Sequence, residues 1–224
     1  MLPCLIYGTL FFAKWFEKEN YFPINKIILS SKLEYTPYSD VEEIVLREVR
    51  RGFFFLSVSR MQADLLTIPW ILSVSVQRQW PDKLEIHITE QKLLARWTDG
   101  RDAALVNISG NLFSPSTQLS EISLPIFYGD VTRVSEMCHY YALLLECLQS
   151  SGFFIKRLEV APDQGWKTIL GNDVVVILGW GEFSERLKRL IIALDSHLKN
   201  KISCIAYFDL RYTNGIAIGW KKLS

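Results

Sequence analysis

The side chains of this sequence that are best suited to chemistry are three histidines, one acidic–basic pair near the carboxyl end and one glycine-rich turn. The histidines are His87, His139 and His197. No two of them have the spacing of three or four residues that places metal ligands on one helical face. Each is therefore interpreted as a structural side chain.

Asp209 and Arg211 lie two residues apart in a stretch that alternates polar and apolar side chains. In a strand this spacing puts both on one face, where they can form an ion pair. A catalytic acid is less well supported, because no second carboxylate or histidine accompanies Asp209. The turn Gly179-Trp180-Gly181 lacks a neighbouring lysine, so it is not interpreted as a phosphate-binding loop. The sequence predicts no enzyme, no metal site and no cofactor.

Length and composition indicate a folded chain that does not bind nucleic acid. The 224 residues suit one large or two small domains, and 49% are hydrophobic against 22% charged. Lysine plus arginine number 25 and aspartate plus glutamate 24, a net charge of +1. A nucleic-acid-binding face usually carries a basic excess, which is missing here. Nothing in the sequence points to a small-molecule substrate either.

The first sixteen residues are apolar except for Lys14. A helix of that length spans about 24 Å, short of the roughly 30 Å hydrocarbon core of a bilayer. No basic segment or small-residue cleavage site marks a signal peptide. We interpret residues 1–17 as a membrane anchor, truncated at its amino end, with a buried helix as the alternative.

The four cysteines show no metal-binding spacing. Cys138 and Cys147 are nine residues apart on one predicted helix, on opposite sides, so they cannot pair with each other. Cys204 could pair with either in an oxidising compartment, but buried free thiols are favoured. Cys4 falls in the apolar leader.

Residues 22–90 predict a small domain in the order strand, helix, helix, strand, strand. The strand at 24–30 is followed by Ser39 and Glu42, spaced as a capping box. Two apolar stripes at helical spacing come next: Val41, Ile44, Val45 and Val49, then Val58, Met61, Leu65 and Ile68.

A hairpin over residues 71–90 then alternates with period two around a Pro-Asp-Lys turn. One face is predicted to be core, with Val74, Val76, Leu84, Ile86 and Ile88. The other is predicted to be solvated, with Ser75, Gln77, Gln79, Glu85 and His87.

Residues 91–224 predict a second domain of mostly antiparallel strands covered on one side by two helices. The fold class is therefore α+β. Strands are expected at 93–97, 104–107, 126–128, 154–160, 166–170 and 174–178. One helix carries Val134, Met137, Cys138, Tyr141, Leu145 and Leu148; the other carries Phe183, Leu187, Leu190, Ile191, Leu194 and Leu198.

The chain ends in a second alternating hairpin, residues 207–220. Asn214-Gly215 suits the positive φ of a tight turn, and the last strand, predicted at 216–222, becomes a sheet edge. An uncovered edge exposes backbone donors and acceptors to which a partner can add a strand.

Four motifs together resemble the FtsQ/DivIB family of bacterial cell-division proteins. They are Pro69-Trp70-Ile71, Gln79-Trp80-Pro81-Asp82, Ala95-Arg96-Trp97 and the closing Asp209-Leu210-Arg211-Tyr212 hairpin through Trp220. The resemblance implies a POTRA domain at 22–90 and an FtsQ-type β domain at 91–224. It also implies a single-pass inner-membrane protein at the division septum, with its amino end cytoplasmic and its bulk periplasmic.

The resemblance further implies a scaffold that links FtsB- and FtsL-like partners through the terminal edge. The positions that match the family motif are Tyr207, Tyr212, Asn214, Gly215 and Trp220; we add Ile216 and Ile218 from the strand itself. The alternative is that Tyr212 and Trp220 fill the core of the sheet.

One departure from the family pattern concerns a possible partner contact. Asp163-Gln164-Gly165 precedes Trp166 where relatives can carry basic residues, which removes the basis for a salt bridge there. The alternative functions are a POTRA-containing periplasmic assembly or export factor and, in the enzyme class, a periplasmic hydrolase.

Overall fold

The structure, a computed structural model, describes residues 22–115, 122–148, 152–181, 184–194 and 198–221. The chain divides into two compact units, with the boundary between Gln91 and Lys92. The predicted anchor at residues 1–17, and with it Cys4, lies outside the described residues, as do Phe183 and His197. Among the residues that are described, no helix is both long and apolar enough to span a bilayer.

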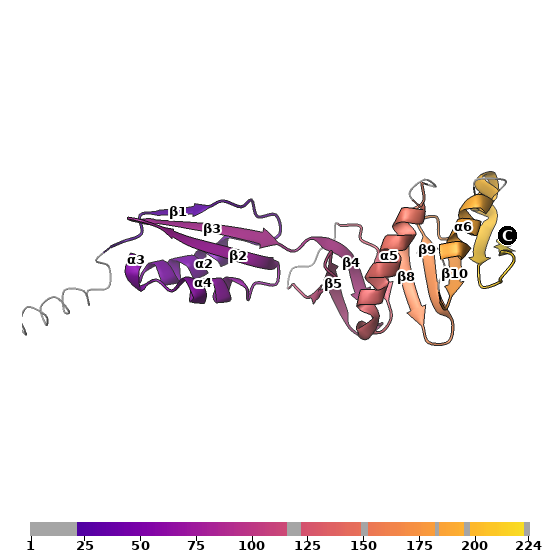
Figure 1. Cartoon of the computed structure of the whole chain (residues 1–224), viewed down its shortest axis with the longest axis horizontal. Helices are drawn as coiled ribbons and strands as arrows, with labels where there is room; N and C mark the ends of the chain where they lie inside the picture. The colour runs from indigo at the N-terminus through magenta and orange to yellow at the C-terminus, as the bar shows by residue number, and fades with distance from the viewer. Residues whose placement is uncertain (1–21, 116–121, 149–151, 182–183, 195–197, 222–224) are drawn as a thin grey trace, which may run out of the picture. The chain divides into compact units, whose positions relative to one another are not determined.

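The first unit is a three-stranded sheet with helices packed on one face (Figure 1). The sheet order is β1-β3-β2, with β1 parallel and β2 antiparallel to the central β3. The elements are β1 (Lys26–Leu29), α2 (Tyr38–Val49), α3 (Gly52–Phe55), α4 (Val58–Leu65), β2 (Ile71–Gln79) and β3 (Lys83–Glu90).

Burial in the first unit follows the two predicted periodicities. Val76, Leu84, Ile86 and Ile88 are buried on the helix side of the hairpin, while the alternate face is exposed or half-buried. The stripes of α2 and α4 pack against them through Val41, Val45, Met61 and Leu65. The assignment of the two hairpin faces is confirmed.

The predicted capping box does not form. Helix α2 begins at Tyr38 after Pro37, and no side chain caps it. The Ser39 hydroxyl instead donates to Asp40, one residue along. Serine lies inside the helix because Pro37 takes the N-cap position, two residues before the predicted cap at Ser39.

The second unit is a nine-stranded sheet in the order β12-β11-β10-β9-β8-β7-β4-β5-β6. Its strands are β4 (Leu93–Thr98), β5 (Ala103–Asn107), β6 (Leu112–Phe113), β7 (Ile126–Tyr128), β8 (Ile155–Ala161), β9 (Gly165–Leu170), β10 (Val175–Gly179), β11 (Ile205–Asp209) and β12 (Ala217–Trp220). Its helices are η1 (Val131–Arg133), α5 (Val134–Leu148), α6 (Ser184–Ala193) and η3 (Lys199–Cys204).

The large sheet is mixed rather than simply antiparallel. Five of its described pairings are antiparallel, but β4–β7, β7–β8 and β10–β11 are parallel. The last two of these parallel pairs are joined by the crossover helices α5 and α6, because parallel neighbours need a long connection. Figure 1 shows these two helices side by side over the sheet.

The core of the second unit lies between the sheet and these helices. Phe127, Trp166 and Phe208 are its largest fully buried side chains. On α5 the prediction for Leu145 is wrong: it is 43% exposed, and Leu144 is buried in its place. Val134, Met137 and Leu148 are buried as predicted, so the buried stripe of the helix differs from the expected one only at this turn.

The cysteines that the structure describes are free thiols. Cys138 and Cys147 are half-buried on α5, and burial raises the pKa of each thiol. Cys204 is exposed at the end of η3, so the expectation of a buried thiol is wrong at this position. The side chain of the next residue, Ile205, is fully buried in the core instead.

Candidate partner-binding edge

Strand β12 is the last strand of the nine-stranded sheet, and it pairs only with β11 in the part of the chain that the structure describes. In register, Ala217 lies opposite Asp209, Ile218 opposite Phe208 and Gly219 opposite Tyr207. A residue later, the amide of Lys221 donates to the carbonyl of Cys204 at 2.7 Å.

The Lys221 bond fixes which backbone groups of β12 face outward. Backbone groups along an antiparallel strand alternate between the partner strand and the opposite side. Since Lys221 bonds to the β11 side, Gly219 and Ala217 do so as well. The amides and carbonyls of Ile218 and Trp220 therefore point away from β11, as a row that an added strand can use.

The side chains around this row divide between the two faces of the sheet. Ile216 and Ile218 are half-buried against the core, and Trp220 follows them on the same face by alternation but is 52% exposed. Tyr207, 42% exposed, lies on the other face. An incoming strand would thus meet one large aromatic on each face.

Gly219 is needed because the Tyr207 ring lies directly over it. A Cβ built at Gly219 would be 2.0 Å from Cε1 of Tyr207, closer than any real contact. The aromatic therefore covers the backbone of β12 from the uncovered face of the sheet. Sequence reasoning missed this contact, because a two-residue turn at Asn214-Gly215 would place Gly219 opposite Leu210 and not opposite Tyr207.

The connection between β11 and β12 is a seven-residue loop, residues 210–216, and not a tight two-residue turn. Neither Asn214 nor Gly215 has positive φ. The predicted turn type is therefore wrong at Asn214-Gly215. Both residues line an open hollow of about 440 Å³ with Tyr212, which is 59% exposed, and with residues 213, 216 and 217.

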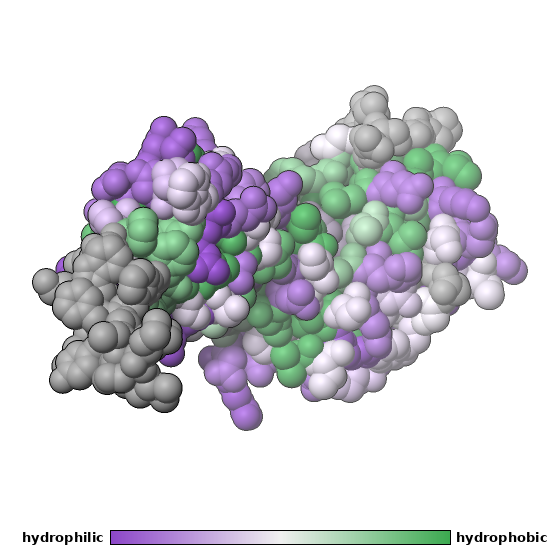
Figure 2. Space-filling model, turned by 60° about the vertical axis from the view of Figure 1, so that its left-hand side comes forward, coloured by the Kyte–Doolittle hydropathy of each residue, from purple (hydrophilic) through white to green (hydrophobic). Residues whose placement is uncertain are grey.

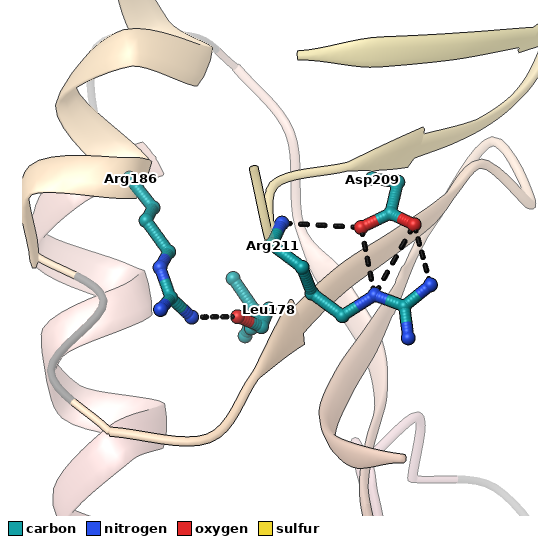
Figure 3. Close-up of polar contacts among 4 residues, drawn as sticks. All are labelled: Leu178, Arg186, Asp209 and Arg211. Carbon is teal, nitrogen blue, oxygen red and sulfur yellow. Dashed lines mark hydrogen bonds and ion pairs between the residues drawn. The ribbon is translucent and has the colours of Figure 1, made fainter. Parts of the chain in front are cut away.

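An ion pair at the end of β11 shapes the loop (Figure 3). Asp209, 5% exposed, accepts from Arg211 Nη2 at 2.6 Å, from Nε at 3.0 Å and from the Arg211 backbone amide at 3.1 Å. These Arg211 hydrogen bonds hold the pKa of Asp209 below its usual value, despite its burial. The predicted ion pair is confirmed, and Tyr212, the next residue, is exposed.

Helix α6 and strand β10 hold the same loop from the core side. Arg189 donates to the carbonyl of Thr213, and the amide of Leu210 donates to the carbonyl of Ile177 at 2.9 Å. Arg186 donates to the carbonyl of Leu178 at the end of β10, as Figure 3 shows. The spacing of apolar residues on this helix did not predict these two arginine contacts.

The described residues hold no group of histidines, cysteines and carboxylates arranged to bind a metal. His87 lies 3.2 Å from the Ser31 hydroxyl, and His139 contacts the ring of Tyr140. The chemistry available at the β12 edge is therefore backbone hydrogen bonding together with aromatic burial.

Apart from the four-residue helix α3, the first unit has the strand–helix–helix–strand–strand order of a POTRA domain. Residues 22–91 match the family model described as POTRA domain, FtsQ-type, and residues 95–211 match the C-terminal domain of cell division protein FtsQ/DivIB. The second match ends at Arg211, so most of the predicted partner-binding residues lie beyond it.

Whole-chain relatives extend the match past that point. The chain is 32% identical over 215 residues to cell division protein FtsQ of Escherichia coli K12. This alignment covers 93% of the present chain and 77% of the relative. It is 29% identical over 221 residues to cell division protein FtsQ of Cellvibrio japonicus, covering 98% and 68%. This chain belongs to the FtsQ/DivIB family of cell division proteins.

Proposed function

We propose that this chain is a division scaffold that recruits FtsB- and FtsL-like partners to the septum by strand addition at β12. The observation that carries the proposal is the outward backbone row of Ile218 and Trp220 on an uncovered edge. Proteins seldom leave a long apolar edge strand exposed to solvent, so a partner that covers this edge is expected.

The aromatic side chains at the edge supply the contacts beyond backbone pairing. Tyr207, Tyr212 and Trp220 are all between 42% and 59% exposed, so none of them is needed to fill the core. Tyrosine and tryptophan bury large areas at small entropic cost, which is why they dominate binding hot spots. Asn214 and Gly215 would let the partner chain approach the loop closely, and Ile216 and Ile218 would hold β12 on the core.

We also propose that residues 1–17 anchor the chain in the inner membrane with the amino end cytoplasmic and residues 22–224 periplasmic. The 22–90 domain would then serve localisation, and the 91–224 domain partner binding. The apolar sequence of the leader supports the anchor. Retention in the membrane fraction after alkaline carbonate washing is the expected result; recovery of a processed, soluble periplasmic form would contradict it.

Proline substitutions at two adjacent positions test strand addition. Ile218→Pro removes an outward amide, which an edge strand tolerates, and so should leave the sheet intact while weakening capture of the FtsB-like partner at least about tenfold. Ala217→Pro removes an inward amide and should lower the melting temperature of the terminal hairpin as well. The affinity for the partner is measured by calorimetry, and the melting temperature by circular dichroism, on both variants.

The pair separates binding from folding. Strand addition at β12 is wrong if Ile218→Pro keeps the parent melting temperature and also binds the partner at parent affinity. Because Ile218 also packs against the core, Ile218→Ala is the reference for lost packing. A loss of folding in Ile218→Pro well beyond that of Ile218→Ala would show that the backbone alternation inferred from Lys221 is incorrect. An Ile192→Ala variant, at an exposed position on α6, serves as a surface control.

A further inference from the structure

Four large aromatic side chains are exposed at one end of the first unit. They are Phe22 at 39%, Phe54 at 50%, Phe55 at 53% and Trp80 at 76%, and we call them the aromatic tip. Only Phe53, between them in sequence, turns into the unit and is buried. Exposed aromatics grouped in this way mark an interaction surface more often than scattered ones do.

Backbone contacts bring the three segments of the tip together. The Phe53 amide donates to the Phe22 carbonyl at 2.8 Å, and the Phe22 and Phe54 rings meet edge to face at 5.0 Å. On the other side, Asn25 donates to Asp82 in the turn after Trp80. Figure 1 shows α3, the β2–β3 turn and the start of the described chain at this same end.

Arg78 ties the hairpin to the phenylalanine segment. Its Nη1 donates to the Phe53 carbonyl at 3.2 Å, from a strand position two residues before Trp80. The tip is therefore held by hydrogen bonds between three segments and does not depend on a single flexible loop.

Basic side chains surround the tip. They are Lys26, Arg50, Arg51, Arg78 and Lys83, all exposed. The nearby carboxylates are already engaged: Glu48 is buried beside Arg51 at 3.4 Å, and Asp82 accepts from Asn25. Figure 2 brings this end forward and shows apolar surface, in green, among hydrophilic side chains.

The sequence that precedes the aromatic tip indicates which surface the tip contacts. The apolar stretch of residues 1–16 is separated from Phe22 by residues 17–21. Six residue steps reach at most about 22 Å, so the tip cannot lie far from wherever the apolar stretch ends. Aromatic rings with a basic rim are the composition that suits the headgroup layer of an anionic bilayer.

We propose that the aromatic tip docks on the headgroup layer of a bilayer containing anionic phospholipid. The rings of Phe54, Phe55 and Trp80 enter the boundary between headgroups and acyl chains, and the basic rim binds lipid phosphates. The tip thereby orients the first unit against the membrane. This inference goes beyond the proposed scaffold function, and it rests on the proposed membrane anchor at residues 1–17.

Fluorescence quenching by lipid tests the docking in the full chain. The four native cysteines are replaced by alanine, and a polarity-sensitive label is attached to Phe55→Cys or, as matched control, Leu72→Cys. Leu72 is 42% exposed on β2, eight residues and so about 26 Å along the strand from Trp80. The proteins are reconstituted in vesicles whose phospholipids carry bromine on the acyl chains.

In phosphatidylcholine vesicles containing phosphatidylglycerol, the label at position 55 should be quenched about twofold more than the label at 72. Combining Arg50→Glu with Lys83→Glu should abolish that difference, with an unchanged melting temperature as the folding control. Neither residue forms an ion pair among the described residues, so the charge reversal breaks none of them.

Equal quenching at 55 and 72 overturns the proposal. Equal quenching with and without phosphatidylglycerol overturns the role of anionic lipid. Shielding of position 55 in cells but not in vesicles would assign the tip to a protein partner and would likewise overturn lipid docking.

Discussion

The two hairpins of this chain differ in which of their side chains are buried. In β2–β3 a single face is buried, the other is polar, and the strands join through the short turn at residues 80–82. In β11–β12 three consecutive residues, Phe208, Asp209 and Leu210, are all buried, and a seven-residue loop follows. The first hairpin buries one whole face, whereas the second buries most of β11 and leaves β12 half-buried to exposed.

The difference comes from what covers each edge. The exposed face of β2 carries Ser73, Ser75, Gln77 and Gln79, polar side chains that solvate the strand. Strand β12 instead carries Ile218, Gly219 and Trp220, with the Tyr207 ring over its glycine. Polar side chains make an edge tolerable in water, while the apolar and aromatic edge gains stability when a partner covers it.

The largest effect should come from charging the core face of the first hairpin. Val76→Asp places an unpaired carboxylate at a position that is 7% exposed and should destabilise the first unit by about 3–5 kcal/mol. Ser75→Asp, the neighbouring outward position, should change stability by less than about 0.5 kcal/mol. Urea unfolding of both variants measures this, and equal midpoints would invert the assignment of faces.

The aromatic anchors of the second hairpin should affect binding and leave stability unchanged. Trp220→Ala or Tyr212→Ala should cost about 2 kcal/mol of partner affinity, which corresponds to roughly thirtyfold weaker binding. Their exposure above 50% predicts melting temperatures like that of the parent. A folded variant that still captures the FtsB-like partner at full affinity and supports septation would move the interaction to the first unit.

Local patterns predicted most of the elements but not the terminal loop. Period-two alternation and helical stripes depend on nearby residues, so the strands and the buried faces of α2 and α4 followed from sequence. The conformation of Asn214-Gly215 did not, because Arg189 of α6 and the Asp209–Arg211 pair hold the loop open. Those contacts join segments more than twenty residues apart or depend on burial, which turn propensity does not include.

The same limit applies to the candidate site. The family motif pointed to Tyr207, Tyr212 and Trp220, but motif positions alone left open whether these side chains were core. Their exposure, and the direction of the Ile218 amide, required the register of β12 on β11. Whether they bind a partner stays a prediction.

A smaller effect should follow from breaking the ion pair that shapes the loop. Arg211→Ala leaves the Asp209 carboxylate with only a backbone donor and should destabilise the second unit, although only modestly, since the arginine is half exposed. Combining it with Asp209→Asn should recover part of the loss, because no buried charge then remains. A double-mutant cycle that shows no coupling energy between Asp209 and Arg211 would show that their ion pair does not stabilise the loop.

The smallest and most selective comparison uses pH, because each hairpin carries a partly buried carboxylate with a lowered pKa, Glu90 in the first and Asp209 in the second. Burial raises the pKa of Glu90, but hydrogen bonds from the backbone at residues 34, 35 and 36 outweigh it and hold the pKa below its usual value. The Arg211 hydrogen bonds do the same for Asp209. A carboxylate whose pKa is lower in the folded state stabilises the fold above its unfolded pKa, near pH 4, and loses that contribution as the pH falls through the folded value.

Both units should therefore be insensitive to acid down to about pH 5 and weaken below about pH 4. Glu90→Gln should cost the first unit about 1 kcal/mol near neutral pH, a gap that closes on acidification, and should leave the second unit unchanged. Asp209→Asn should destabilise the second unit near neutral pH and leave the first unit unchanged. Hydrogen exchange resolved by peptide, comparing residues 31–36 with 205–216, reports each unit separately. If Glu90→Gln altered both segments equally, the two regions would not be independent, and the contrast between a folding hairpin and a binding hairpin would fail.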